Sequence, residues 1–173
     1  MGRSTSSDSR MTRWVASPSA TRAWATAWYF GAPRPASIKR LVSHVVSRSS
    51  GCQYCAAHTG FQATRSGGVS PEKIEAAFEY ETSPLFSEDE RAALRVAQSA
   101  AAVPNEVTDE DMDELKKHFS DRQIVELVGQ ISVFGFLNRW NDTMATELES
   151  LPTQYGNDHL AKYGWETGKH SAG

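Results

Sequence analysis

The stretch LVSHVVSRSSGCQYCAAHTG, residues 41–60, contains both cysteines of the 173-residue chain and two of its five histidines. A helix over about residues 37–48 is predicted by apolar residues that recur at helical spacing: Ile38, Leu41, Val42, Val45 and Val46. Ser49-Ser50-Gly51 breaks this pattern. A second helix is expected to begin at the cysteines with Ser50 as its N-cap, and to run to about Thr64.

Helix start signals continue along the rest of the chain. Pro71 suits the first turn of a helix over PEKIEAAFEYE, and Ser87 with Glu90 forms the pattern of a capping box. Thr108 precedes a segment with acids in its first turn and lysines in its last. Ser120 precedes the longest segment, which is expected to be helical to about residue 149. No segment alternates as a half-buried strand does, so the fold class is predicted to be all-α, with no sheet.

The domain organisation follows from composition. Hydrophobic residues make up 39% of the chain and charged residues 23%, values typical of a globular protein. We expect a disordered or poorly ordered segment over residues 1–29, a helical domain over 30–150 and a polar C-terminal tail over 151–173. The Arg- and Ser-rich start also resembles a transit peptide, and Met11 is an alternative first residue.

Apolar runs in this chain are short. No run of 18 or more apolar residues is present, so no membrane span is expected. Pro18 and Arg22 interrupt the one stretch that could serve as the apolar region of a secretory signal. The expected location is therefore the cytoplasm.

Charge is divided unevenly along the chain. Residues 1–71 hold nine basic residues and one acid, a net charge of +8, whereas the remainder holds 20 acids and nine basic residues, a net charge of −11. The basic residues are scattered singly, without the clusters typical of nucleic-acid binding, so no nucleic-acid partner is expected. Attraction between the two halves is the simpler consequence, and a cationic surrounding favours a thiolate at the cysteines.

A possible internal repeat relates two segments 86 residues apart. IKRLVSHVVSRSSGCQYC aligns with IVELVGQISVFGFLNRWN, so that apolar positions coincide and Cys52 and Cys55 correspond to Asn138 and Asn141. Two amphipathic helix pairs can match in this way by chance. The alternative is a repeated helix-hairpin unit of which only the first copy keeps a reactive site.

Cys52-x-x-Cys55 could belong to several kinds of site. Haem attachment requires a histidine directly after the second cysteine, and Ala56 and Ala57 intervene here. A structural zinc site requires four ligands, and only His58 joins the cysteines at ligand spacing. A catalytic zinc held by these three ligands is an alternative, but no metal is expected. A structural disulfide would close a very short loop and add little stability.

A reactive dithiol is the remaining interpretation. Cys52, Cys55 and His58 step by three residues, so on a helix they share one face. A cysteine in the first turn lies near unpaired backbone N–H groups and the positive helix end, which favour a thiolate. An imidazole on the same face could accept or return a proton. Thioredoxin-like proteins carry such a motif between strand and helix, but here no strand precedes the cysteines.

The chain resembles the alkylhydroperoxidase/carboxymuconolactone decarboxylase-like family, which has the all-helical AhpD-like fold. The resemblance lies in LVSHVVSRSSGCQYCAAHTG, in FSEDERAALRVA and in FSDRQIVELVGQISVFGFLNRWNDTMATELE, and covers roughly residues 30–150. It implies a peroxidase-type oxidoreductase that needs no bound cofactor and forms trimers or hexamers. An external thiol system would reduce the disulfide that a hydroperoxide or disulfide substrate generates.

The resemblance also implies roles for individual residues. Cys55 corresponds to the cysteine that is oxidised to sulfenic acid, Cys52 to the one that resolves it as a disulfide, and His58 to the histidine of the proton relay. Two positions depart from the family pattern. The usual relay histidine position is Thr59, and the usual relay glutamate position is Arg40, which cannot act as a base.

Other residues are candidates for support of the dithiol. They are His44, Tyr54, Glu90 and Glu126, with Tyr54 more simply explained as a packing residue and His44 as a hydrogen-bonded helix histidine. The polar run Asn138–Asp142 is expected to fix the last long helix against the cysteine helix or to line the rim of the site. The segment VFGFL, residues 133–137, is apolar all round and is expected to be buried in the domain or in a subunit interface.

Alternative functions remain open at this point. One is a redox-sensing or interaction protein that kept the fold and the dithiol without turnover. Another is a lyase of the carboxymuconolactone decarboxylase type, which does not need a cysteine pair.

Overall fold

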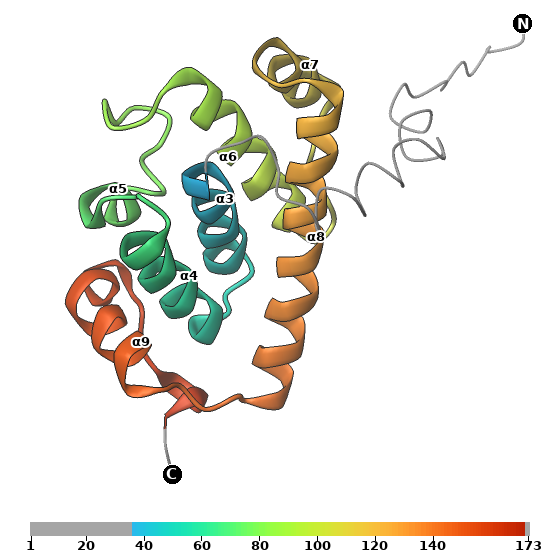
Figure 1. The fold of residues 1–173 in the computed structure, drawn as a ribbon. Helices are drawn as coiled ribbons and strands as arrows, with labels where there is room; N and C mark the ends of the chain where they lie inside the picture. The colour runs from blue at the N-terminus through green and yellow to red at the C-terminus, as the bar shows by residue number, and fades with distance from the viewer. Residues whose placement is uncertain (1–35, 172–173) are drawn as a thin grey trace, which may run out of the picture.

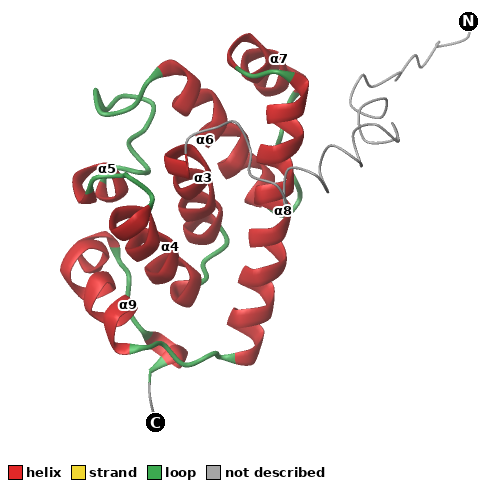
Figure 2. Cartoon of the chain, in the orientation of Figure 1, coloured by secondary structure: helices red, strands yellow, loops and turns green. Residues whose placement is uncertain are grey.

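The computed structural model describes residues 36–171. The expectation for residues 1–29 lies outside this range. Within it the elements are α3 (Ala36–Ser49), α4 (Gln53–Ser66), α5 (Pro71–Glu75), α6 (Glu88–Ala101), α7 (Asp109–His118), α8 (Asp121–Met144) and α9 (Ser150–Tyr155). A π-helical turn, η1 (Gly156–Leu160), and two 3₁₀ turns, η2 (Ala161–Tyr163) and η3 (Gly168–His170), follow. The described residues contain no strand, which confirms the all-α fold class (Figure 2).

Helix α3 is the centre of the fold. It packs against α4 on one side and against α6 and α8 on the other, and α9 lies beyond α4 (Figure 1). Its buried positions include Leu41, Val42 and Val45, which are fully excluded from solvent. The apolar spacing of this segment therefore predicted the core helix correctly, within one residue at each end.

Capping boxes open α6, α7 and α8. Ser87 with Glu90 opens α6, Thr108 with Asp111 opens α7, and Ser120 with Gln123 opens α8. In each box the side chain three residues later accepts from the N-cap backbone N–H, one of the groups near a helix start that need a partner, and the Thr108 hydroxyl also accepts from the Asp111 N–H. The sequence signals at the three start positions are confirmed.

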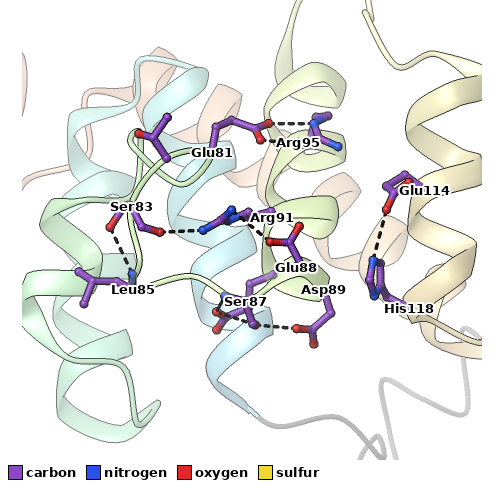
Figure 3. A network of polar contacts seen from close by, with 12 residues as sticks. Glu81, Ser83, Leu85, Ser87, Glu88, Asp89, Arg91, Arg95, Glu114 and His118 are labelled. Atoms are coloured by element: carbon purple, nitrogen blue, oxygen red, sulfur yellow. Dashed lines mark hydrogen bonds and ion pairs between the residues drawn. The ribbon is translucent and has the colours of Figure 1, made fainter.

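The segment before α6 is held by arginines of that helix (Figure 3). Arg91 donates to the Ser83 carbonyl oxygen at 3.0 Å, and Arg95 forms two hydrogen bonds with the Glu81 carboxylate at 2.7 and 2.8 Å. The helix predicted over residues 71–81 is shorter than expected, because α5 ends at Glu75 and the chain continues in turns.

Helix α8 runs without a break through the second copy of the possible repeat. The turn Ser50-Gly51 in the first copy corresponds to Phe136-Leu137, which favour continuation of the helix. No second hairpin is formed, so the repeat does not extend to a helix-hairpin unit. The helix ends at Met144, five residues before the predicted end, where Ala145 adopts a left-handed conformation.

The C-terminal stretch differs from the expected polar tail. After α8 the chain folds back along α4 through α9, η1 and η3. Tyr155, Leu160, Trp165 and His170 are all buried. Apolar residues here are few and widely spaced, so they carry no periodic signal in the sequence, yet they cover the helix that bears the cysteines.

The helices in the described part of the chain fall short of what a membrane crossing requires in length and apolar character. The segment VFGFL is not buried as expected within this single chain. Phe136 is 63% exposed, and the neighbouring Trp140 and Met144 are 56% and 62% exposed.

Candidate functional site

Cys52 is the N-cap residue of α4, whereas the sequence predicts Ser50 in this role. Gly51 takes a left-handed backbone conformation (φ +72°) that glycine adopts without strain, and it turns the chain so that Cys52 is extended. The Cys52 Sγ then accepts a hydrogen bond from the backbone N–H of Cys55 at 3.2 Å. The first thiol therefore takes the place that a serine or aspartate oxygen occupies at most helix starts.

Cys55 lies one turn into α4, and both cysteines are free thiols. Its exposed fraction is 4%, and that of Cys52 is 1%. From α8, Asn141 donates an amide hydrogen bond to the Cys55 Sγ at 3.6 Å, and Asn138 bonds the Val46 carbonyl oxygen at 3.4 Å. The polar run on α8 thus fixes that helix against the cysteine hairpin, as the sequence predicted.

The thiols differ in their electrostatic surroundings. The pKa of Cys52 is lowered, chiefly because the Cys55 thiol donates a hydrogen bond to it, with the Cys55 backbone N–H adding to the effect against burial. The pKa of Cys55 is raised, because it is the donor in that bond, because it is buried and because it lies beside Cys52. These directions favour a thiolate on Cys52 and a thiol on Cys55. The family resemblance assigns the attacking role to Cys55 instead.

His58 lies on the cysteine face of α4, but its ring nitrogens are engaged elsewhere. Its Nδ1 lies 3.2 Å from the Tyr54 carbonyl oxygen, and its Nε2 forms an ion pair with Glu149 at 2.9 Å. The Tyr54 ring stacks on the His58 ring at 4.2 Å. Glu149 was not singled out in the sequence, because only the fold brings residue 149 to α4.

His44 lies beneath α4 and is fully buried. Its Nδ1 is 3.1 Å from the Thr59 hydroxyl, which donates to the Cys55 carbonyl oxygen at 2.7 Å. Burial, assisted by the nearby Arg48 cation, lowers the pKa of His44 to about 3. His44 is therefore a neutral ring that supports the backbone of the cysteine helix through Thr59.

The two glutamates considered as relay acids lie away from the dithiol. Glu90 serves the capping box in the first turn of α6 and pairs with Lys73 at 2.7 Å. The start of α6 lies at the end of the molecule opposite the start of α4 (Figure 1). Glu126 is buried near Lys39 at 3.5 Å. It precedes Asn141 by 15 positions on α8, about 22 Å along the helix axis.

The C-terminal segment covers the start of α4. Trp165 donates its indole N–H to the Gln53 carbonyl oxygen at 2.9 Å. The buried His170 is 2.8 Å from the Thr146 carbonyl oxygen, and its ring lies 5.9 Å from that of Tyr54. Neither residue was predicted, because the segment reads as polar overall.

A hollow opens beside Cys52. Counted with its mouth, it holds about 350 Å³ of empty space, and Arg48, Tyr163 and Trp165 line it together with the Cys52 turn. Within residues 36–171, no group of three or more His, Cys, Asp or Glu side chains is arranged to hold a metal ion.

Sequence and structure comparisons agree on the relationship. The model of the carboxymuconolactone decarboxylase family matches residues 16–99. The debrominase Bmp8, in a cysteine-to-alanine variant bound to 2,3,4-tribromopyrrole, is 31% identical, with a TM-score of 0.71 over 81% of this chain and 74% of that one. The chain belongs to the carboxymuconolactone decarboxylase family.

A second structure of Bmp8 and two further proteins are also similar to this chain. The apo form of Bmp8 is 35% identical, with a TM-score of 0.68 over 72% of this chain and 67% of that one. The uncharacterized protein YnjA of Escherichia coli K12 is 30% identical over 66% of this chain, and the match spans 62% of its own length. ATU0492 of Agrobacterium tumefaciens, of unknown function but suggested to be an AhpD-type antioxidant protein, is 23% identical. Its TM-score of 0.64, over 82% of this chain and 98% of that one, shows that the fold is AhpD-like.

Proposed function

We propose that this protein is a thiol-dependent oxidoreductase that reduces hydroperoxides with the Cys52–Cys55 dithiol. The observation that carries the proposal is the position of Cys52 at the start of α4, where its Sγ accepts a hydrogen bond from the Cys55 backbone N–H at 3.2 Å. A sulfur that accepts a backbone N–H at a helix N-terminus is suited to be a thiolate, the nucleophilic form of cysteine.

The reaction balances with these two thiols alone. The Cys52 thiolate attacks the terminal oxygen of the hydroperoxide, an S–O bond forms and the O–O bond breaks. The departing alkoxide takes the Cys55 proton and leaves as the alcohol. The Cys55 thiolate then attacks the Cys52 sulfenic acid, forms the disulfide and releases hydroxide, which solvent protonates. Two equivalents of an external thiol return the pair to the reduced state.

His58 is the group we assign to proton exchange with solvent. It follows Cys55 by one turn, its side chain is about one-fifth exposed, and Glu149 holds its Nε2. His44 and Tyr54 act as supports in this scheme, His44 through Thr59 and Tyr54 through its stacking on His58.

Reductive removal of halogen is a second candidate function. It is favoured by the similarity to the debrominase Bmp8 across most of both chains. Replacing a carbon–bromine bond by a carbon–hydrogen bond requires two electrons, and a dithiol that closes to a disulfide supplies two. The same nucleophile would serve both reactions.

The deciding experiment follows consumption of hydroperoxide in the presence of excess dithiothreitol. The native protein should consume many equivalents per subunit, whereas a redox sensor would be oxidised once. Cys52→Ser should abolish turnover. Cys55→Ser should still form one sulfenic acid, detectable with dimedone, but should not close a disulfide.

The Cys52→Ser and Cys55→Ser variants also show which cysteine attacks the hydroperoxide. A sulfenic acid on Cys55 in the Cys52→Ser protein, with none on Cys52 in the Cys55→Ser protein, would reverse the two roles. Unchanged turnover in both folded variants would contradict the proposed function altogether. Assays with a bromopyrrole, monitored by bromide release, test the second candidate in the same protein samples.

A further inference from the structure

The hollow beside Cys52 is lined by an arginine and two aromatic side chains, Tyr163 and Trp165. It lies between the last turn of α3, the Gly51-Cys52 turn and the segment after η2. Its lining residues are Arg48, Gly51, Cys52, Gln53, Ala56, Tyr163, Gly164 and Trp165. Cys52 is the cysteine that reaches this hollow, so a molecule seated in it would lie beside the proposed nucleophile.

Arg48, one of the lining residues, has an unsatisfied hydrogen-bond donor. Its Nη1 atom is buried and has no hydrogen-bond partner. The guanidinium instead lies over two aromatic rings, 4.6 Å from the centre of Phe78 and 5.7 Å from that of Tyr163. Burial also lowers the pKa of Arg48. A partly buried cation with an unused N–H is costly to keep, and an anion that accepts from it would offset the cost.

Other charges near Cys52 are already matched. Asp142 raises the pKa of Cys52 and Lys169 lowers it, and these two side chains form an ion pair with each other at 2.9 Å. Among the described residues that line the hollow, Arg48 is the charged one. Planar guanidinium groups bind carboxylates through two parallel hydrogen bonds, and Tyr163 and Trp165 offer flat apolar surface beside it.

We propose that this hollow is an anion subsite, in which Arg48 holds the carboxylate of an organic substrate whose reactive atom faces Cys52. The inference deepens the proposed function, on which its substrate assignment rests, by naming the substrate class: a small hydroperoxide that carries a carboxylate on an apolar or aromatic body. Neutral hydroperoxides of the same size lack the group that Arg48 binds.

The first test compares iodoacetate with iodoacetamide as alkylating agents of Cys52. Both reagents form an S–C bond and release iodide, but only iodoacetate carries a carboxylate. Fragment-ion mass spectrometry separates Cys52 from Cys55 on their shared peptide. The ratio of the two rates at Cys52 should be about tenfold lower in Arg48→Gln than in the native protein. Arg48→Lys should retain part of the ratio, because it keeps the charge but loses the planar fork.

Arg65→Gln is the matched control. Arg65 is in the last turn of α4 and lies over the Phe61 ring, about 20 Å along the helix from Cys52, so this variant makes the same change in net charge away from the hollow. Its rate ratio should equal that of the native protein. Circular dichroism and thermal unfolding establish that each variant is folded.

A competition measurement on the native protein tests the same anion subsite without any variant. Benzoate should slow alkylation of Cys52 by iodoacetamide, and benzyl alcohol at the same concentration should not. Equal rate ratios in the native and Arg48→Gln proteins, absence of protection by benzoate, or a Cys52 that neither reagent reaches would each overturn the subsite.

These readouts do not use hydroperoxide. If the alkylation results are as expected but the protein has no peroxidase turnover, the anion subsite is supported and the proposed function is contradicted. If turnover is present, a carboxylate-bearing hydroperoxide should have a KM about tenfold below that of a neutral one of equal size, and Arg48→Gln should abolish the difference.

Discussion

His44 is a titratable residue whose charge state is fixed by its surroundings. Its pKa is lowered to about 3 in the folded protein, from 6.5 in an exposed chain. The unfolded state therefore binds a proton that the native state does not, and stability is lost as pH falls from about 6.5 toward 3. From pH 8 to pH 5 this residue should lower the free energy of unfolding by about 2 kcal/mol.

Urea denaturation at the two pH values measures this loss. His44→Asn keeps an N–H donor near the Thr59 hydroxyl but does not titrate, so its stability should fall by about 2 kcal/mol less over the same interval. Parallel pH profiles for the native and variant proteins would show that His44 is protonated normally in the folded state.

Asn141 tunes the second cysteine. Its amide donates to the Cys55 Sγ at 3.6 Å and lowers the pKa of that thiol against the stronger opposing effects. Under the proposed function, Asn141→Leu should slow disulfide closure about fivefold, because the Cys55 thiolate loses a donor. Quenched-flow alkylation after one equivalent of hydroperoxide measures this step.

Thr146→Val is the control for Asn141. The Thr146 hydroxyl donates to the Asn141 Oδ1 at 2.9 Å, so this variant removes a neighbouring bond and leaves the amide donor in place. Disulfide closure should keep its native rate. Slowing in Thr146→Val equal to that in Asn141→Leu would assign the effect to a general loosening of α8.

Apart from the polar run Asn138–Asp142 on α8, the residues of the site could be predicted only as far as they are neighbours in the chain. Cys52, Cys55 and His58 share a helix face, and spacing alone places them together. Glu149 and Arg48 could not be assigned in this way. Glu149 reaches His58 because the chain reverses direction in the loop that follows α8. The unpaired donor of Arg48 can be identified only in the folded structure, where it is buried.

The C-terminus of α8 contains the one positive-φ residue other than glycine in the described chain, Ala145 at φ +49°. A Cβ in this region costs about 1–2 kcal/mol, and glycine avoids the cost but loses about 0.5–1 kcal/mol through the flexibility of its unfolded state. Ala145→Gly should therefore stabilise the protein by about 0.5–1 kcal/mol in thermal or urea unfolding.

Ala102→Gly is the corresponding control. Ala102 is the C-cap of α6, but its backbone is extended, with φ −69° and ψ 152°. Glycine brings no relief there and should destabilise by about 0.5–1 kcal/mol. Stabilisation of equal size at both caps would mean that the left-handed conformation is not the cause.

For the individual helices, sequence signals predicted the N-termini better than the C-termini. The starts at Ser87, Thr108 and Ser120 were predicted correctly, because a capping box is a local hydrogen-bond pattern. The start of α4 was misplaced by two residues, because a cysteine acts as its N-cap and the serine before it does not. The end of α8 was overestimated, since the left-handed Ala145 has no sequence signature.

An apolar stripe on α8 is exposed at the surface of the single chain. We propose that a second copy of this chain covers it. Val128, Phe136, Trp140 and Met144 recur at multiples of four residues and are all exposed. The expected trimer or hexamer, implied by the family resemblance, would bury such a stripe. Light scattering at micromolar concentration should give three or six times the mass of one chain.

Trp140→Glu should shift that mass toward one chain, because a carboxylate would be buried without a partner. Arg139→Glu, on an exposed neighbouring position of α8, should leave the mass unchanged. A native protein that scatters as a single chain would contradict the assembly.

The hydrogen bond from Trp165 to Gln53 joins residues 112 positions apart. Synthesis proceeds from the N-terminus at about 5–20 residues per second, so the dithiol is made on the order of ten seconds before the segment that covers it. During that interval a nascent chain carries the cysteine pair without its C-terminal cover. A product cut short before Trp165 would keep both thiols in this open condition for its whole lifetime.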